Sequence, residues 1–211
     1  MTIHTILFDL DGTLIDTNEL IIDSFRHTFN AYGKELSREE AIQFIGPPLR
    51  DTFLQFAPEQ VDAMIETYRG YNQQHHDDYV VAFPYVAETL EKLRKRDIQL
   101  GVVTTKMRRT VGMGLKVTGL DHFFDTVVTL DDVTHAKPHP EPVMNAMTAF
   151  GAKADATLMV GDNSHDIEAG QNAGVKTAAV AWSLKGREKM LTYQPTYLLD
   201  DMRDLLQIAG V

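Results

Sequence analysis

The sequence predicts an α/β protein: a doubly wound parallel sheet with an all-helical segment inserted after its first strand. Short apolar runs alternate with amphipathic stretches, which is the pattern of such a sheet. No strand-like run is found between Asp16 and about Ala82, and this gap predicts the helical insert. With 211 residues and 44% hydrophobic side chains, the chain can bury a core of this size.

Five apolar runs have the composition of buried parallel strands, which carry apolar residues on both faces. These runs are residues 5–9, 99–105, 125–129, 157–162 and 176–182. The stretches between them have helical periodicity, and Gly119, Gly151 and Gly174 stand where helices should end. Ligands of a doubly wound sheet bind beyond the carboxyl ends of its strands, so we expect the functional residues there.

The inserted segment has helical spacing throughout. Ile21, Phe25 and Phe29 share one helix face, and Val61, Ile65 and Tyr68 share another. We therefore expect two domains: a core of residues 1–15 and 82–211, and a helical domain of residues 16–81. Hinges near Asp16 and Ala82 would let the helical domain open and close over the core.

Composition restricts the class of protein. The net charge of −10 argues against nucleic acid as a partner, because such binding depends on Lys and Arg against phosphates. The absence of cysteine excludes disulfides and thiolate metal sites. No window is apolar enough to span a membrane, and the N-terminus has no signal-peptide pattern, so a cytoplasmic protein is expected. Oligomeric state is open, with a monomer as the expectation.

Carboxylates follow two of the predicted strands. Asp9 and Asp11 end the first, and Asp162 and Asp166 follow the fourth. Four carboxylates in one small pocket would repel one another, so some would take up protons unless a cation joined them. Ligation by oxygen alone suits Mg²⁺, which we expect as the cofactor.

Positive and neutral hydrogen-bond donors gather at the same edge. Thr104 ends the second strand, Lys137 precedes a proline-marked helix start, and Gly12 leaves backbone N–H groups accessible. Together with Mg²⁺, these groups suit a phosphoryl group, and a carboxylate facing that group is a potential nucleophile.

The residues "DLDGT", Thr104, Lys137 and "GDNSHD" resemble the four motifs of the haloacid dehalogenase (HAD) phosphohydrolase superfamily, and the insert resembles its type-1 cap. The resemblance implies that Asp9 is the nucleophile and a metal ligand. It implies that Asp11 is the general acid and base, with its backbone carbonyl on the metal. Thr104 and Lys137 would hold the transferring oxygens, Asp162 would ligate the metal, and Asp166 would orient metal-bound water.

Five further residues are expected to contact the substrate or to support the residues that do: Gly12, Arg50, Thr105, Lys106 and Asn163. Asn163 departs from the serine that is common after the motif aspartate, although its amide could still reach a metal-bound water or a substrate oxygen. Arg50 follows "GPP" in the insert and is a candidate contact for the substrate. The alternative is a solvated arginine at a helix start.

Residues 17–25, 44–53, 128–143, 160–167 and 204–211 resemble the bacterial inorganic pyrophosphatases of this superfamily. The substrate implied is a small phosphorylated compound, with pyrophosphate favoured and phosphoglycolate or another small phosphomonoester as the alternative. A non-enzymatic phospho-accepting switch also uses clustered aspartates, but it has no use for a helical lid. A hydrolytic dehalogenase is a third interpretation, although a second carboxylate at Asp11 better fits a phosphoryl leaving group.

Overall fold

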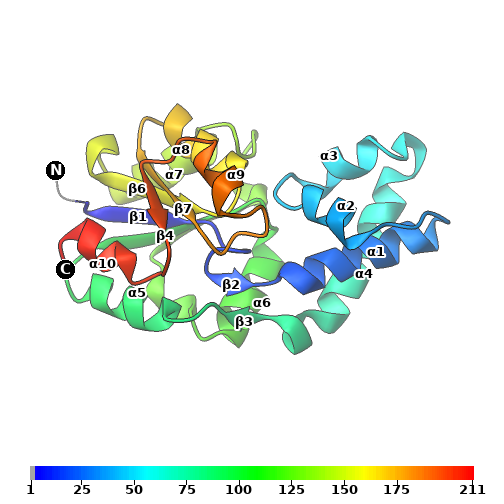
Figure 1. Ribbon diagram of the computed structural model, residues 1–211, viewed down its shortest axis with the longest axis horizontal. Coiled ribbons are helices and arrows are strands. Elements are labelled where there is room, and N and C mark those ends of the chain that lie inside the picture. Colours follow the sequence, from blue (N-terminus) through cyan, green and yellow to red (C-terminus); the bar gives the residue numbers. More distant parts are fainter. Residues whose placement is uncertain (1–2) are drawn as a thin grey trace.

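A six-stranded parallel sheet forms the centre of the molecule in the computed structural model, which describes residues 3–211 (Figure 1). Its strands are β1 (Thr5–Phe8), β4 (Gln99–Val103), β5 (Thr126–Val128), β6 (Thr157–Gly161), β7 (Lys176–Val180) and β8 (Tyr197–Leu199). They lie in the order β5-β4-β1-β6-β7-β8, with β1 paired to both β4 and β6. This order reverses direction at β1, which confirms the predicted doubly wound sheet.

Helices cover both faces of the sheet because alternate strand residues point to opposite sides. On one face, Ile6 and Phe8 pack with α5 (Val86–Arg94), α6 (Arg108–Val117) and α10 (Asp204–Ala209). On the other face, Leu7 packs with α7 (Glu141–Phe150) and α8 (Ser164–Asn172). The short α9 (Arg187–Leu191) lies on the same side as α8 in Figure 1 and packs on β7 through Met190.

The inserted segment forms a separate group of helices beside the sheet (Figure 1). It contains α1 (Asn18–Ala31), α2 (Arg38–Gln43), α3 (Leu49–Leu54) and α4 (Val61–Tyr79), with a 3-10 turn before α4. Its interior is its own apolar cluster, in which the rings of Phe25, Phe29, Phe53 and Tyr68 contact one another. A separate core allows this group to hold its shape independently of the sheet.

Two short strands join the inserted helices to the sheet. β2 (Ile15–Asp16) and β3 (Val81–Ala82) pair antiparallel, so the chain enters and leaves the helical segment at one place. Residues 17–80, all of which the structure describes, contain helices and no strand, as expected, and the two short strands lie at Asp16 and Ala82, where the hinges are expected. The pair of β2 and β3 lies at the boundary that we propose between the two domains. These domains are a core of residues 1–15 and 82–211 and a helical domain of residues 16–81.

Three further elements near the C-terminus, α9, β8 and α10, follow β7 and are not predicted from the sequence. β8 completes one edge of the sheet by pairing with β7, from Ala178 to Val180. Among residues 3–211 no helix combines the length and the apolar character that a membrane crossing requires.

Candidate active site

The switch point of the sheet carries the predicted site residues. Asp9 and Asp11 follow β1, Thr104 follows β4, and Asp162 follows β6, so neighbouring strands deliver them to one edge. A cavity of about 860 Å³ opens there, lined by these four residues on the sheet side and by parts of α1, α3 and α4 on the other. The site therefore lies between the sheet and the inserted helices.

The side chain of Lys137 bridges two of the carboxylates, those of Asp9 and Asp166. Its Nζ donates to Oδ1 of Asp9 at 2.8 Å, to Oδ1 of Asp166 at 2.6 Å and to the carbonyl oxygen of Val103 at 2.9 Å. The side chain is only 3% exposed. Burial alone would lower the pKa of Lys137, but the charges of Asp166 and Asp9 outweigh burial and raise it. The ammonium group is therefore a permanent positive charge inside the site.

The aspartates remain crowded despite Lys137. Asp9, Asp162 and Asp166 each offer a carboxylate oxygen, and these oxygens lie within 4.8 Å of one another. Burial is the largest cause that raises the pKa of Asp9, to about 7. The charge of Lys137 lowers this pKa in part, and the charge of Asp166 raises it. Burial and the charges of Asp166 and Asp9 raise the pKa of Asp162 well above its ordinary value. A divalent cation would relieve this repulsion, so the oxygen donors present fit a metal ion.

Not all three aspartates are equally free to bind a metal. Oδ1 of Asp166 accepts from Lys137, and its Oδ2 accepts from the backbone N–H of Asn163 at 3.0 Å, in a capping box that begins α8. Asp166 is therefore held on both oxygens. Asp9 and Asp162 are left as the carboxylates that can turn toward an ion.

Gly12 lets Asp162 approach the loop after β1. Its φ of +76° is in the left-handed region, and a Cβ there would lie 2.5 Å from Oδ2 of Asp162. The neighbouring Thr13 donates its hydroxyl to Oδ1 of Asp162 at 3.4 Å. A side chain at position 12 would therefore displace the carboxylate from the site.

Asp11 is held by two donors. Its Oδ1 accepts from Nζ of Lys106 at 2.7 Å and from the hydroxyl of Thr17 at 2.7 Å. Lys106 comes from the loop after β4, and Thr17 is the residue between β2 and α1. The Asp11 side chain is 17% exposed and lines the cavity, so it can still reach a bound molecule. Thr17 is not predicted as a site residue, because no local pattern in the sequence marks it.

Two site residues hold the inserted helices against the sheet. Nδ2 of Asn163 donates to the carbonyl oxygen of Ile45 at 2.8 Å, and the hydroxyl of Thr105 donates to the carbonyl oxygen of Gly46 at 3.1 Å. The contact is close, because a Cβ at Gly46 would lie 2.4 Å from Nδ2 of Asn163. Asn163 and Thr105 thus contact the loop between α2 and α3, which carries Ile45 and Gly46.

We expect Gly46→Ala to weaken this contact. The φ of Gly46 is +116°, and its new methyl group would push Asn163 away from Ile45. Loss of two hydrogen bonds worth about 1 kcal/mol each should lower kcat/KM roughly tenfold or more. Gly33→Ala is the control, because Gly33 also has a positive φ, +71°, but nothing within 4 Å of its Cβ position. Equal kinetic losses in both variants would contradict a role for the contact.

Arg50 lines the cavity near the start of α3, but its guanidinium pairs with Asp62 of α4. Its predicted contact with the substrate therefore stays a prediction. The cavity wall also contains Arg109, which follows Lys106 near the start of α6, and two residues that the sequence patterns do not single out, Arg69 and Asn72. Asn72 could have been found, because it is four residues after Tyr68 on the otherwise apolar stripe of α4 and is buried.

Fold and cavity together define a capped α/β enzyme, in which a helical insert covers a site at the switch point of a parallel sheet. The chain belongs to the haloacid dehalogenase-like hydrolases, because the model of that family matches residues 6–180. It is 58% identical over 212 residues to a protein of Anoxybacillus flavithermus named pyrophosphatase PpaX, a match that covers 100% of this chain and 99% of that protein.

Solved structures agree with the family. A haloacid dehalogenase-like hydrolase of Streptococcus pneumoniae superposes with a TM-score of 0.86 at 27% identity, covering 97% of each chain. A protein of Haemophilus somnus, described as a predicted phosphoglycolate phosphatase, superposes with a TM-score of 0.86 at 26% identity. That match covers 99% of this chain and 98% of the other. This chain is therefore a hydrolase of the family.

Proposed function

We propose that this hydrolase cleaves pyrophosphate in the presence of Mg²⁺, through a phosphoryl group carried on Asp9. The observation that supports the chemistry most directly is the buried group of Asp9, Asp162 and Asp166 with Lys137 among them. A neutral or purely apolar pocket could not stabilise a phosphoryl group, which carries several negative charges.

Asp9 is the nucleophile in this proposal. Lys137 occupies its Oδ1, so Oδ2 is the oxygen that attacks phosphorus. The bond from phosphorus to the leaving oxygen breaks as the bond to Oδ2 forms, and the leaving phosphate receives the proton of Asp11, which is left as a carboxylate. The hydroxyl of Thr104, which lies at the cavity wall, and the ammonium of Lys137 stabilise the oxygens in transfer.

Water completes the reaction in a second step. Asp11 takes a proton from a water molecule, and the resulting hydroxide attacks phosphorus of the aspartyl phosphate. The bond from phosphorus to Oδ2 of Asp9 breaks, which releases phosphate and restores the carboxylate. Lys106 and Thr17 keep Asp11 in place for both transfers, because they hold its Oδ1 and leave Oδ2 for the proton.

The residues that would hold Mg²⁺ are Asp9, Asp162 and the backbone carbonyl of Asp11, with Asp166 orienting water beside them. When bound, the ion would neutralise the crowded carboxylates and add positive charge for the phosphoryl oxygens. The support is the all-oxygen donor set and the raised pKa values of Asp9 and Asp162. A cytoplasmic location and a monomeric state stay predictions from the sequence.

Pyrophosphate is the substrate we favour, because the relative named pyrophosphatase PpaX is 58% identical along the whole chain. The match covers the inserted helices as well as the sheet. The second phosphate of pyrophosphate needs positive partners, and Lys106, Arg50 and Arg109 line the cavity. Phosphoglycolate is the alternative, since it is also small and anionic and a structural relative is described as its phosphatase.

A comparison of substrates tests the choice. With Mg²⁺ present, we expect kcat/KM for pyrophosphate to exceed that for phosphoglycolate by about tenfold or more, the effect of roughly 1.4 kcal/mol in transition-state binding. Phosphate release is measured for both on one preparation. A tenfold preference for phosphoglycolate would contradict pyrophosphate as the substrate but would not affect the assignment to the hydrolase family. A stable aspartyl phosphate without turnover would instead support a phospho-accepting switch.

A further inference from the structure

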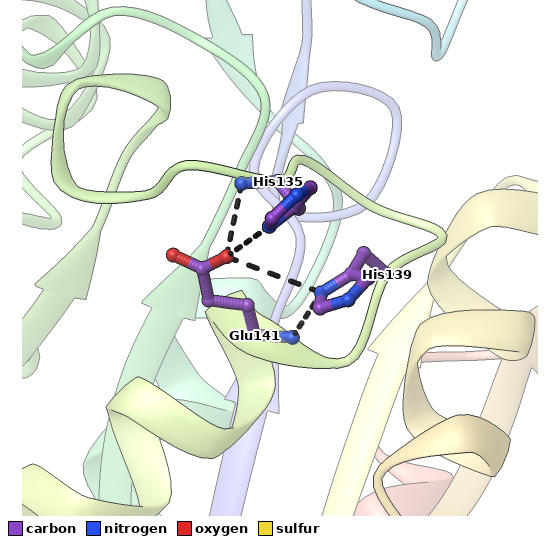
Figure 2. Close-up of side chains that lie close together, drawn as sticks. All are labelled: His135, His139 and Glu141. Carbon is purple, nitrogen blue, oxygen red and sulfur yellow. Dashed lines mark hydrogen bonds and ion pairs between the residues drawn. The ribbon is translucent and has the colours of Figure 1, made fainter.

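A second group of potential metal ligands lies on the loop that carries Lys137. Figure 2 shows His135, His139 and Glu141 with both imidazole rings beside one carboxylate. Nδ1 of His135 is 2.9 Å from Oε2 of Glu141, and Nδ1 of His139 is 4.0 Å from the same oxygen. The two ring centroids are 4.5 Å apart.

These side chains are distinct from the candidate active site. Lys137, between the two histidines in sequence, turns inward to Asp9 and Asp166. His135 and His139 instead face solvent, with side chains 61% and 49% exposed. An ion could reach them without entering the cavity, whose lining includes neither histidine.

The carboxylate of Glu141 is already held in place. The backbone N–H of Thr134 donates to its Oε1 at 2.7 Å, and that of His135 donates to its Oε2 at 2.9 Å. These hydrogen bonds lower the pKa of Glu141, and the bond from Thr134 has the largest effect. The group is therefore ionised at neutral pH, and little conformational freedom remains to be lost when it binds an ion.

We propose that His135, His139 and Glu141 bind a divalent transition-metal ion of the Zn²⁺ class, through both Nδ1 atoms and Oε2, with water at the open position. Imidazole nitrogen with carboxylate oxygen suits Zn²⁺, Co²⁺ or Ni²⁺, whereas Mg²⁺ prefers oxygen alone. This donor set therefore selects a different ion from the aspartates at the switch point.

Only small movements are needed. Zn–N and Zn–O bonds of about 2.0–2.1 Å place tetrahedral ligand atoms roughly 3.3 Å apart. The His135 to Glu141 distance must lengthen slightly from 2.9 Å, and the His139 to Glu141 distance must shorten from 4.0 Å. His139 also gives up the N–H of Glu141, 3.2 Å from its Nδ1. That N–H is in the first turn of α7, where water can replace the bond.

Calorimetric titration of the full chain with Zn²⁺, in saturating Mg²⁺, tests the site. We expect one Zn²⁺ per chain that Mg²⁺ does not displace, and an affinity at least about tenfold lower in His139→Ala. His122→Ala is the matched control, because His122 is also exposed beside a carboxylate, that of Asp121 at 3.9 Å, and should bind as wild type. Co²⁺ should give the visible absorption of a tetrahedral complex, lost in His139→Ala.

Phosphate release with Mg²⁺ alone should be unchanged in His139→Ala, which shows that the variant folds. If His139→Ala does not fold, Glu141→Gln serves instead, since its amide oxygen still accepts from Thr134 while the charge is lost. Equal Zn²⁺ affinity in wild type and either folded variant would overturn the site. Displacement of Zn²⁺ by Mg²⁺ would also overturn it, because the ion would then occupy the aspartates.

Discussion

Asp9→Asn should lower the turnover number on the order of 10⁴-fold or more, the size of loss seen when an enzyme's nucleophile is removed. The amide has the shape of the carboxylate, and its oxygen can still accept from Lys137 at the position of Oδ1. It has no charged oxygen with which to attack phosphorus. Steady-state phosphate release with Mg²⁺ measures the loss, and circular dichroism checks the fold.

Asp155→Asn is the matched control for this change. Asp155 is an exposed aspartate on the 3-10 turn Ala154–Ala156, at the opposite end of β6 from Asp162, and its variant should keep wild-type turnover. Near-wild-type activity in a folded and pure Asp9→Asn protein would contradict the covalent mechanism. The family assignment would survive that result, since it depends on the match over residues 6–180.

Removal of Mg²⁺ with excess chelator should reduce phosphate release to the uncatalysed background. Without the ion, the pKa of Asp9 is raised to about 7, so much of the nucleophile is protonated at neutral pH. Added Mg²⁺ should restore turnover. Ca²⁺ should not, because its longer bonds and higher coordination number place Asp9 differently.

Asp162→Ala should have the same effect as the chelator, or should raise the Mg²⁺ concentration needed for half-maximal turnover. Asp162 is 5% exposed and lies against Gly12, so no other side chain can take its place without rearrangement. Asp155→Ala again serves as the exposed control. Full activity in excess chelator, or an unchanged Mg²⁺ requirement in Asp162→Ala, would contradict the metal site.

Local patterns were sufficient for most of the sheet. β1, β4, β5, β6 and β7 each lie inside a predicted apolar run, because buried parallel strands need apolar residues on both faces. β8 could not be found in this way. Residues Tyr197–Leu199 are too short a run to stand out, and they become a strand only by pairing with β7 at the edge of the sheet.

In the candidate site, too, the sequence predicts one part, the set of residues, and does not predict another, the contacts between them. Asp9, Thr104 and Asp162 could be predicted together, because the carboxyl ends of parallel strands meet at one edge of a sheet. Their proposed roles in catalysis stay predictions until the variants are measured. The contacts that position them could not be predicted, since they join residues far apart in the sequence.

By itself, therefore, the sequence determined the alternation of strands and helices, the helical insert and the set of polar residues at the strand ends. The tertiary structure alone decided how those residues are held. It placed Lys137 between Asp9 and Asp166, 128 and 29 residues away, and Asn163 against the carbonyl of Ile45, 118 residues away. Periodicity depends on neighbours along the chain, whereas these bonds depend on how the elements pack.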